Sequence, residues 1–450
     1  MVSEVPSRTN SGWTSTPLRS ILQKTSVRDR PDLQLLSVLR SRGVIRRNFD
    51  KSENHNFIPD DLSNYKVVEQ GDLVINKMKA WSGSVGVSRF DGIVSPAYIV
   101  CKVRGCNPSF LNLLLRSDPL MNEFARHSDG VRVGQWDLSP QALKVIRVAI
   151  PSIEDQEGIV RYLDNAELRI ARAIQAKSKA TKLLREARDS MINELVLGDS
   201  LSRGNSVDSG IPGIGMVPKH WRLVRAKYVW RPKNIRSKTG DEERLSVSSM
   251  SGIVPRSSKK VTMFEAVSYV GHKVVEPGDL VINSLWAWAT GLGVSRHHGL
   301  VSPVYGVYEL RPESESDLTY LNYLLRSNAI QWQFQVQSKG IWRSRLQLSD
   351  DAFFRIVIPL PPLSEQISIA SLISSRIAGL DAAINAAEHE IILLREYRTR
   401  LIADVVTGQK DVRAEAADLP DVDPLELAQV LSGTIAIGDD VDEEVSVDAD

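Results

Sequence analysis

The sequence has few of the features by which exported proteins and metalloproteins are usually recognised. Only two of its 450 residues are cysteine, Cys101 and Cys106, which excludes a disulfide scaffold and a structural zinc site with several cysteine ligands. No run approaches 18 consecutive apolar residues, and residues 1–20 contain no apolar stretch typical of a secretory signal. We therefore expect no membrane span and a protein of the reducing cytoplasm.

Motifs for catalysis and nucleotide binding are also missing. No glycine is followed by lysine, which excludes a P-loop, and Gly291–Gly293 lacks the remaining spacing of a dinucleotide-binding motif. The adjacent His297 and His298 are typical of a solvated turn. Residues 107–110, NPSF, faintly resemble an amino-methyltransferase motif but lack its second proline, so a helix N-cap at Asn107 is the better interpretation. We expect no active site, no metal site and no cofactor bound by this chain.

Charge is distributed unevenly along the chain. The net charge is only +1, but residues 411–450 contain 13 acidic residues and one basic residue. Residues 1–410 therefore carry a net charge of about +13. A basic body with a separate acidic tail is typical of polyanion-binding proteins. Because many soluble proteins carry such a surplus without binding nucleic acid, charge alone leaves both interpretations open.

The chain consists of two copies of one unit. Residues 66–98 and 273–305 agree at 21 of 33 positions at a constant offset of 207. Further along, the offset is 210, and Gln156 recurs as Gln366. The motif LLRE at 183–186 likewise recurs at 393–396. Each copy is about 200 residues long, so the sequence predicts a duplicated architecture.

Each copy divides into a mixed globule and a long helix. Short β-like runs punctuated by glycine and proline fill the globules, which we place at 1–153 and 216–363. After a proline-rich exit, residues 156–197 and 366–407 contain no proline and end at a glycine. Their apolar residues recur every three or four positions, and forty-two helical residues span about 63 Å. Such a helix needs a partner of similar length, which we expect to be the other copy; the packing residues are Ile159, Leu163, Ile170, Leu184, Ile369, Ile373, Leu380 and Leu394.

The expected fold class is α/β (α+β), with two duplicated mixed α/β domains separated by two long coiled-coil helices. We place the helices at 154–198 and 364–408. A Ser/Gly/Asp-rich linker is expected at 199–215, and an acidic, flexible tail at 409–450.

The two copies diverge in two loops inside a shared frame. KMKAWSGSV at 77–85 replaces SLWAWATGL at 284–292, and GVRVGQWD at 130–137 replaces GIWRSRLQ at 340–347. One scaffold with different loop side chains is typical of a fold that reads two DNA sequences, because Arg and Lys bind guanine, Gln binds adenine, and apolar groups contact thymine methyls. Trp81 and Trp288, present in both copies, are more often core residues. The candidate DNA-binding residues are Lys77, Lys79, Arg132 and Gln135 in the first copy, Trp286, Trp342, Arg343 and Arg345 in the second, and the shared Arg89 and Arg296 as phosphate contacts.

This organisation resembles the specificity subunit of a type I restriction-modification enzyme over about residues 13–408. The features that carry the resemblance are the doubled domains with GDLVIN…VSP, the exits IPSIEDQ at 150–156 and LPPLSEQ at 360–366, and the opening MVPKHW at 216–221. The first copy departs from the family in having SGWTSTPL in place of that opening. The acidic tail has no counterpart in the family.

The resemblance implies a non-catalytic subunit whose long helices pack antiparallel and whose two target-recognition domains each bind half of a split double-stranded DNA target. It also implies two modification subunits, which methylate adenine with S-adenosylmethionine, and two restriction subunits, which translocate and cleave DNA with ATP and Mg²⁺. Two other classes stay open: a stand-alone enzyme with unrecognised motifs, and a structural coiled-coil adaptor whose globules bind protein.

Overall fold

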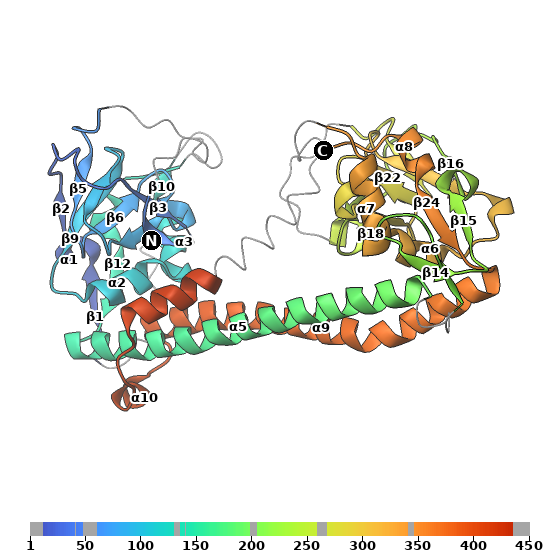
Figure 1. Ribbon diagram of the computed structural model, residues 1–450. Helices are drawn as coiled ribbons and strands as arrows, with labels where there is room; N and C mark the ends of the chain where they lie inside the picture. Colours follow the sequence, from blue (N-terminus) through green and yellow to red (C-terminus); the bar gives the residue numbers. More distant parts are fainter. Residues whose placement is uncertain are drawn as a thin grey trace. The chain divides into compact units, whose positions relative to one another are not determined.

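The computed structural model describes residues 12–40, 42–47, 61–129, 136–139, 141–198, 205–258, 268–340 and 346–434. The chain divides into two compact units. Of the described residues, those up to Ile174 and those within Ile391–Thr434 form unit 1, and those within Gln175–Glu390 form unit 2. The two long helices, α5 (Ile153–Val196) and α9 (Leu363–Val406), each contribute one part to each unit (Figure 1). The sequence-based division treats these helices as separate segments, whereas the structure divides each of them between the units.

Unit 1 is built on a four-stranded antiparallel sheet with the strand order β2-β9-β6-β7. Four two-stranded pairs surround this sheet: β1 with β12, β3 with β4, β5 with β8, and β10 with β11. The strands are β1 (Thr14–Pro17), β2 (Leu22–Thr25), β3 (Leu36–Leu39), β4 (Gly43–Arg46), β5 (Lys66–Val68), β6 (Leu73–Asn76), β7 (Val85–Val87), β8 (Gly92–Val94), β9 (Tyr98–Val103), β10 (Ser128–Asp129), β11 (Asp137–Leu138) and β12 (Arg147–Ile150). The shorter helices of the globule are α1 (Leu18–Ile21), η1 (Ala80–Ser82), α2 (Pro108–Leu115), α3 (Asp118–Arg126) and α4 (Ala142–Val145).

Unit 2 repeats this arrangement, with a sheet of order β16-β23-β20-β21 and the pairs β15–β24, β17–β18 and β19–β22. The repetition extends to the register, because Leu73 pairs with Val87 as Leu280 pairs with Val294. The strands are β13 (Ser206–Asp208), β14 (Met216–Pro218), β15 (Arg222–Arg225), β16 (Trp230–Pro232), β17 (Leu245–Ser248), β18 (Gly252–Pro255), β19 (Lys273–Val275), β20 (Leu280–Ile282), β21 (Leu292–Val294), β22 (Gly299–Val301), β23 (Gly306–Leu310) and β24 (Val357–Leu360). The shorter helices are η2 (Ala226–Tyr228), η3 (Arg256–Ser258), η4 (Ala287–Ala289), η5 (Pro312–Ser314), α6 (Leu318–Leu325), α7 (Asn328–Gln337) and α8 (Asp350–Arg355).

Helix α2 begins at a side-chain cap. The Asn107 Oδ1 atom accepts hydrogen bonds from the backbone N–H groups of Ser109 and Phe110 at 2.9 and 3.1 Å. In unit 2, Asp317 caps α6 in the same way by accepting from the Tyr320 N–H at 2.7 Å. Interpretation of NPSF as a helix N-cap is therefore confirmed.

Segments of both long helices form part of the core of each unit. In unit 1, Ile159, Leu163 and Ile170 of α5 are buried in one cluster with Val405 of α9. In unit 2, Ile369 and Ile373 of α9 are buried with residues of α5 that include Ile192 and Leu195. The other expected packing residues, Leu184, Leu380 and Leu394, are half-buried.

Ion pairs show the direction in which the helices pack. In unit 2, Arg188 of α5 binds Asp381 of α9 at 2.6 Å, and Lys177, further back along α5, binds Glu390, further along α9. In unit 1, Glu167 binds Arg398 at 2.8 Å. The antiparallel pairing of the long helices is thus confirmed within each unit.

Within the described part of the chain, α9 is the one helix that is long and apolar enough to cross a membrane by composition. Its apolar residues, however, contribute to the protein cores of both units. Only 28% of its most apolar stretch is buried inside the protein, so burial accounts for part of the apolar composition of α9.

The segment expected to be a linker is folded where the structure describes it. Residues 206–208 form β13, which pairs antiparallel with β14. Ile214 is buried in the core of unit 2, and a Cβ added at Gly213 would lie 3.2 Å from the Cβ of Trp332. Isolated isoleucines inside a Ser/Gly-rich run thus dock this segment, which composition alone does not show.

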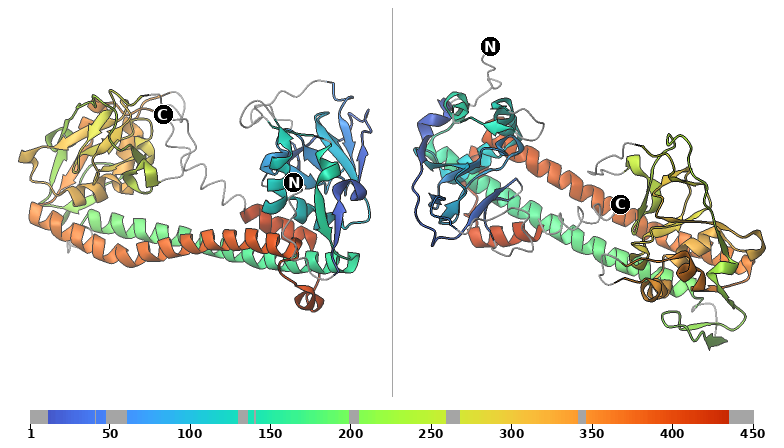
Figure 2. Two further views of the ribbon diagram at one scale, coloured as in Figure 1. Left: turned by 180° about the vertical axis from the view of Figure 1, so that it is seen from behind. Right: turned by 90° about the horizontal axis from the view of Figure 1, so that it is seen from above.

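The acidic tail differs from expectation in a similar way. Its described part, 409–434, contains α10 (Arg413–Ala417) and a further helix at 424–434, which lies along α5 in unit 1 (Figures 1 and 2). Glu426 pairs with Arg172 of α5, and the Pro420 carbonyl accepts a hydrogen bond from Asn165 Nδ2 at 2.8 Å. Three of its apolar side chains, Val412, Ala416 and Leu427, are buried and stabilise this part, whereas Leu425 is 78% exposed.

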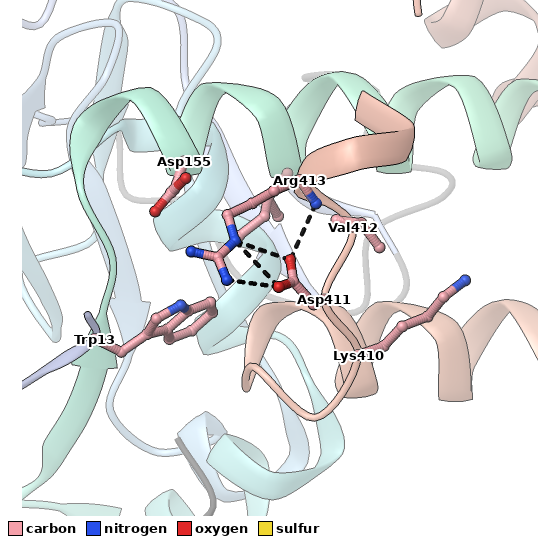
Figure 3. A pocket seen from close by; sticks show the side chains of 7 residues that line it. Trp13, Asp155, Lys410, Asp411, Val412 and Arg413 are labelled. Atoms are coloured by element: carbon pink, nitrogen blue, oxygen red, sulfur yellow. Dashed lines mark hydrogen bonds and ion pairs between the residues drawn. The ribbon is translucent and has the colours of Figure 1, made fainter. Parts of the chain in front are cut away.

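The chain that leaves α9 closes against the start of α5 (Figure 3). Arg413 Nη2 and Asp411 Oδ2 lie 2.6 Å apart, and Lys410 Nζ donates to the Tyr162 hydroxyl at 2.7 Å. Trp13 and Asp155 line the same small hollow, whose volume of about 10 Å³ suits a single water molecule. We interpret these contacts as structural, because they fix the chain after α9 to the first turns of α5.

Candidate nucleic-acid interface

The first variable loop follows strand β6 in unit 1 and turns through η1 into β7. The Asn76 Oδ1 atom accepts from the Met78 N–H at 3.2 Å, and the Asn76 carbonyl accepts from the Lys79 N–H at 3.0 Å. Gly83 ends the turn with a φ of 88°, a conformation that glycine adopts without strain. The shared asparagine therefore sets the shape of a loop whose other residues vary.

The equivalent loop of unit 2 has the same backbone. Asn283 Oδ1 accepts from the Leu285 N–H at 3.1 Å, and its carbonyl accepts from the Trp286 N–H at 3.0 Å. Thr290 occupies the position of Gly83 at a φ of 61°. The two loops thus share their backbone and differ in side chains.

The second variable segment lies beside the first in each unit. In unit 1 it connects β10 to β11, and the Leu138 N–H donates to the Lys77 carbonyl at 2.8 Å. In unit 2, Lys339 and Gln347 form an isolated antiparallel bridge, and the Leu348 N–H donates to the Ser284 carbonyl at 2.9 Å. The fold therefore brings together the two segments in which the copies differ. We call the described residues of these segments the variable surface of each unit: 77–84 with 128–129 and 136–138, and 284–291 with 338–340 and 346–348.

A shared tryptophan supports each variable surface. The indole N–H groups of Trp81 and Trp288 donate to the carbonyls of Met78 and Leu285 at 3.2 and 3.0 Å. The aromatic partner, however, comes from different segments. Trp81 packs on Trp136 and Trp288 stacks on Trp286, each with a ring-centroid distance of 5.4 Å. Trp286, a predicted DNA-binding residue, is therefore half-buried against the shared tryptophan.

The structure places the predicted lysines of unit 1 on this surface. The Lys77 Nζ atom binds the Asp137 Oδ2 atom at 2.8 Å, and the two side chains are 35% and 48% exposed. Lys79 is also exposed. Arg132, Gln135, Trp342, Arg343 and Arg345 lie outside the described residues.

Arg89 and Arg296 are exposed, but they lie elsewhere. Arg89 follows β7, whereas the variable loop precedes that strand, so the two lie at opposite ends of β7. Arg296 has the same position after β21. The structure thus separates both arginines from the variable surfaces, and their assignment as phosphate contacts stays a prediction.

Arg89 influences the electrostatics of helix α5 instead. Burial raises the pKa of Asp164 on α5 to about 6, the negative charge of Glu167 adds to the rise, and the positive charge of Arg89 opposes it. Arg89 therefore contributes to the electrostatics of the junction between globule and helix in unit 1.

Other shared residues are structural. Asp72 Oδ2 accepts from the Glu69 N–H at 3.0 Å, as Asp279 Oδ2 does from the Glu276 N–H at 2.7 Å, so both aspartates stabilise the turn before the following strand. Arg116 donates from Nη1 to the Val85 carbonyl at 2.9 Å and thereby holds the strand that follows the variable loop. The residues that both copies share thus stabilise the backbone of the turns and strands.

Two residues of the variable surfaces were missed by sequence reasoning. Asp137 and Gln347 are the final residues of the second variable segments and align with each other at the offset of 210. Both are exposed. The alignment of the copies contained this signal, but the contact of Asp137 with Lys77 could be found only from the structure.

No group of three or more His, Cys, Asp or Glu side chains that could hold a metal ion occurs among the described residues. His298 Nδ1 lies 3.1 Å from Glu276 Oε2, so that histidine forms an exposed surface pair. Both cysteines are free and buried, and burial raises the pKa of each thiol to about 11. The thiols are therefore protonated and unreactive at neutral pH.

The comparisons with known proteins bear on the fold. No family model matches the chain. A chain from a structure of the type I R-M system, solved to explain complex assembly and conformational transition, is similar with a TM-score of 0.58 and 17% identity over 90% of this chain and 100% of its own length. The HsdS subunit from Thermoanaerobacter tengcongensis has a TM-score of 0.47 and 16% identity, over 90% of this chain and 100% of its own.

A third similar structure is the type I restriction-modification system S subunit from M. genitalium, with a TM-score of 0.36 and 11% identity over 94% of this chain and 99% of its own. Two of the three scores lie below 0.5, so the assignment rests on the first structure. That likeness shows that this chain has the fold of a chain from a type I R-M system.

Proposed function

We propose that this protein is the DNA-recognition subunit of a type I restriction-modification enzyme. In this proposal, each unit binds one half of a split double-stranded DNA target through its variable surface. The chain itself is non-catalytic and works in the cytoplasm. The fold likeness and the duplicated architecture support the proposal.

One observation carries the proposal. The two copies keep the residues that shape the loops, such as Asn76 and Asn283, and change the side chains exposed on them. A catalytic or structural surface would keep its side chains in both copies. Different side chains on loops of the same backbone are what two different DNA half-sites require, because base edges are distinguished by side-chain chemistry.

Partner subunits would supply the chemistry. We expect two modification subunits with S-adenosylmethionine and two restriction subunits with ATP and Mg²⁺, bound through exposed faces of the long helices. The shared motif LLRE supports a docking face for a modification subunit in each unit. Its first leucine is exposed in both copies: Leu183, in unit 2, is 56% exposed, and Leu393, in unit 1, is 47% exposed. Replacing either leucine by aspartate should weaken binding of one modification subunit and leave the DNA sequence preference unchanged.

The proposal is tested by selecting bound sequences from random double-stranded DNA. The full-length chain is used with the modification subunits of its own organism, at several salt concentrations. We expect two specified blocks separated by a fixed number of unspecified base pairs, with affinity that falls as salt rises. Binding that is independent of salt and blind to sequence would favour a protein-binding adaptor. Methylation or cleavage by the purified chain alone would favour a stand-alone enzyme.

A further inference from the structure

The equivalent positions 77/137 and 284/347 of the two variable surfaces carry different hydrogen-bonding chemistry. In each unit, one backbone hydrogen bond joins the two segments at this place, from Leu138 to Lys77 and from Leu348 to Ser284, at 2.8 and 2.9 Å. The backbone link is thus common to both copies. The side chains on it are not, since Lys77 and Asp137 are replaced by Ser284 and Gln347.

In unit 1, the side chains form a donor and an acceptor side by side. Lys77 Nζ and Asp137 Oδ2 are 2.8 Å apart, and both side chains remain accessible. An exposed ion pair of this kind contributes little to folding, so stability does not explain its presence. It presents a cation and a carboxylate oxygen to whatever approaches the surface.

This spacing matches the major-groove edge of a G·C pair. Guanine presents the acceptors N7 and O6, and cytosine presents the N4 amino donor. O6 and N4 are themselves joined by a base-pair hydrogen bond, so they lie about 2.9 Å apart. Lys77 can therefore donate to guanine while Asp137 accepts from the cytosine of the same pair. In an A·T pair the amino group lies between two acceptors, so an ammonium beside the carboxylate reaches one acceptor, whereas on a G·C pair it reaches the two adjacent acceptors O6 and N7.

In unit 2, the chemistry is that of adenine recognition. The Ser284 side chain is buried, and its Oγ donates to the Val304 carbonyl at 2.9 Å, which leaves it unsuited to contact DNA. Gln347 is exposed, and its amide forms no hydrogen bond within the described residues. A glutamine amide pairs with the N6 donor and N7 acceptor of adenine in a bidentate manner.

We propose that these two positions determine one base pair in each half-site, G·C through Lys77 and Asp137, and A·T through Gln347. This inference rests on the proposed function and deepens it. It makes the pair of positions 77 and 137 a specificity determinant that can be exchanged between the units, because the backbone beneath it is the same.

The test exchanges the chemistry between the units. In the first variant, K77S/D137Q, unit 1 receives the side chains of unit 2; in the second, S284K/Q347D, unit 2 receives those of unit 1. Each variant is expressed in full length with its modification subunits, and adenine methylation is mapped across the genome. We expect K77S/D137Q to change one G·C pair of one half-site to A·T, with the other half-site and the spacer unchanged.

A matched control comes from the other end of β6, where Lys102 of β9 pairs with Glu69 of the turn before β6. The Lys102–Glu69 pair has the same length, 2.8 Å, and similar exposure, but it lies at the start of β6, whereas Lys77 follows its end. The variant K102S/E69Q removes an equal charge pair and should leave the methylated motif unchanged. Circular dichroism confirms that each variant is folded.

Each outcome decides the inference. If K77S/D137Q methylates the same DNA motif as the unmodified protein, the inference is overturned. If the unmodified protein directs methylation of no split motif, the proposed function is overturned instead. If a variant loses methylation, binding to a DNA library randomised in one half-site replaces the mapping. Preference for the original base pair should then fall roughly tenfold to a hundredfold at one position. An equal loss of affinity for all sequences contradicts the inference.

Discussion

The buried glutamine at the start of each long helix should be essential to the junction between globule and helix. Gln156 is 1% exposed, and its Oε1 atom accepts from the Asn107 N–H at 2.7 Å. Its Nε2 atom donates to the Pro151 carbonyl at 2.9 Å. The side chain thus ties the first turn of α5 to the cap of α2, which packs under the sheet of unit 1.

The cost of removing this side chain follows from the groups that it leaves behind. In Q156A, the Asn107 N–H and the Pro151 carbonyl lose their partners, and each unsatisfied buried group costs about 1–3 kcal/mol. We therefore expect the local free energy of opening to fall by about 2–5 kcal/mol. A loss of 2 kcal/mol corresponds to roughly 30-fold faster amide exchange.

Hydrogen–deuterium exchange of the peptide that covers residues 105–115 measures this effect directly. Because Gln366 holds the Asp317 N–H at 2.8 Å in unit 2, Q366A should accelerate exchange around residue 317 and leave residues 105–115 unchanged. Q141A, at an exposed glutamine of unit 1, is the matched control. Exchange in Q156A within threefold of the unmodified protein would refute the reasoning.

Three further predictions concern the long helices. Because the pKa of Asp164 is raised to about 6, ionisation of this carboxyl group destabilises the folded state as pH rises from 4 to 6. D164N should therefore stabilise the protein by about 1–3 kcal/mol at pH 7 and by little at pH 4, as measured by thermal unfolding. Glu167 is buried beside Arg398, so R398A should lower the free energy of unfolding by about 2 kcal/mol. The double variant E167Q/R398A should recover most of this loss, because it removes the unpaired buried charge. Equal melting temperatures of R398A and E167Q/R398A would contradict this prediction. A seven-residue insertion at matching points of α5 and α9 lengthens each helix by about 10.5 Å. We expect the preferred spacer between half-sites, measured by DNA selection, to grow by roughly three base pairs. An unchanged spacer would show that the helices do not set the spacer length.

Much of the fold could be predicted from the sequence because the signals are local or repeated. The β-like runs punctuated by glycine predict short strands joined by turns, and the structure has β5, a turn at Asp72 and β6 within residues 66–76. The proline-free stretches predict the long helices, which begin within three residues of the expected positions. Comparison of the copies also located both variable segments of each variable surface.

The parts that could not be predicted depend on contacts between distant residues. Lys77 and Asp137 are 60 positions apart, and their pairing follows from how the β10–β11 hairpin packs beside η1. The described tail is folded because Val412 and Ala416 join the core of unit 1 and Leu427 is also buried. Its overall acidity conceals those few contacts, since composition averages over them.

The central claim is that this chain determines the sequence of a split DNA target. The most direct measurement is genome-wide mapping of adenine methylation in the source cell with and without the gene for this chain. The account predicts one motif, made of two specified blocks and an unspecified spacer, that is methylated in the parent and unmethylated after deletion. The measurement requires a parent cell in which the modification subunits are expressed and methylate DNA. If the parent cell and the deletion strain then have the same set of methylated motifs, the claim is contradicted.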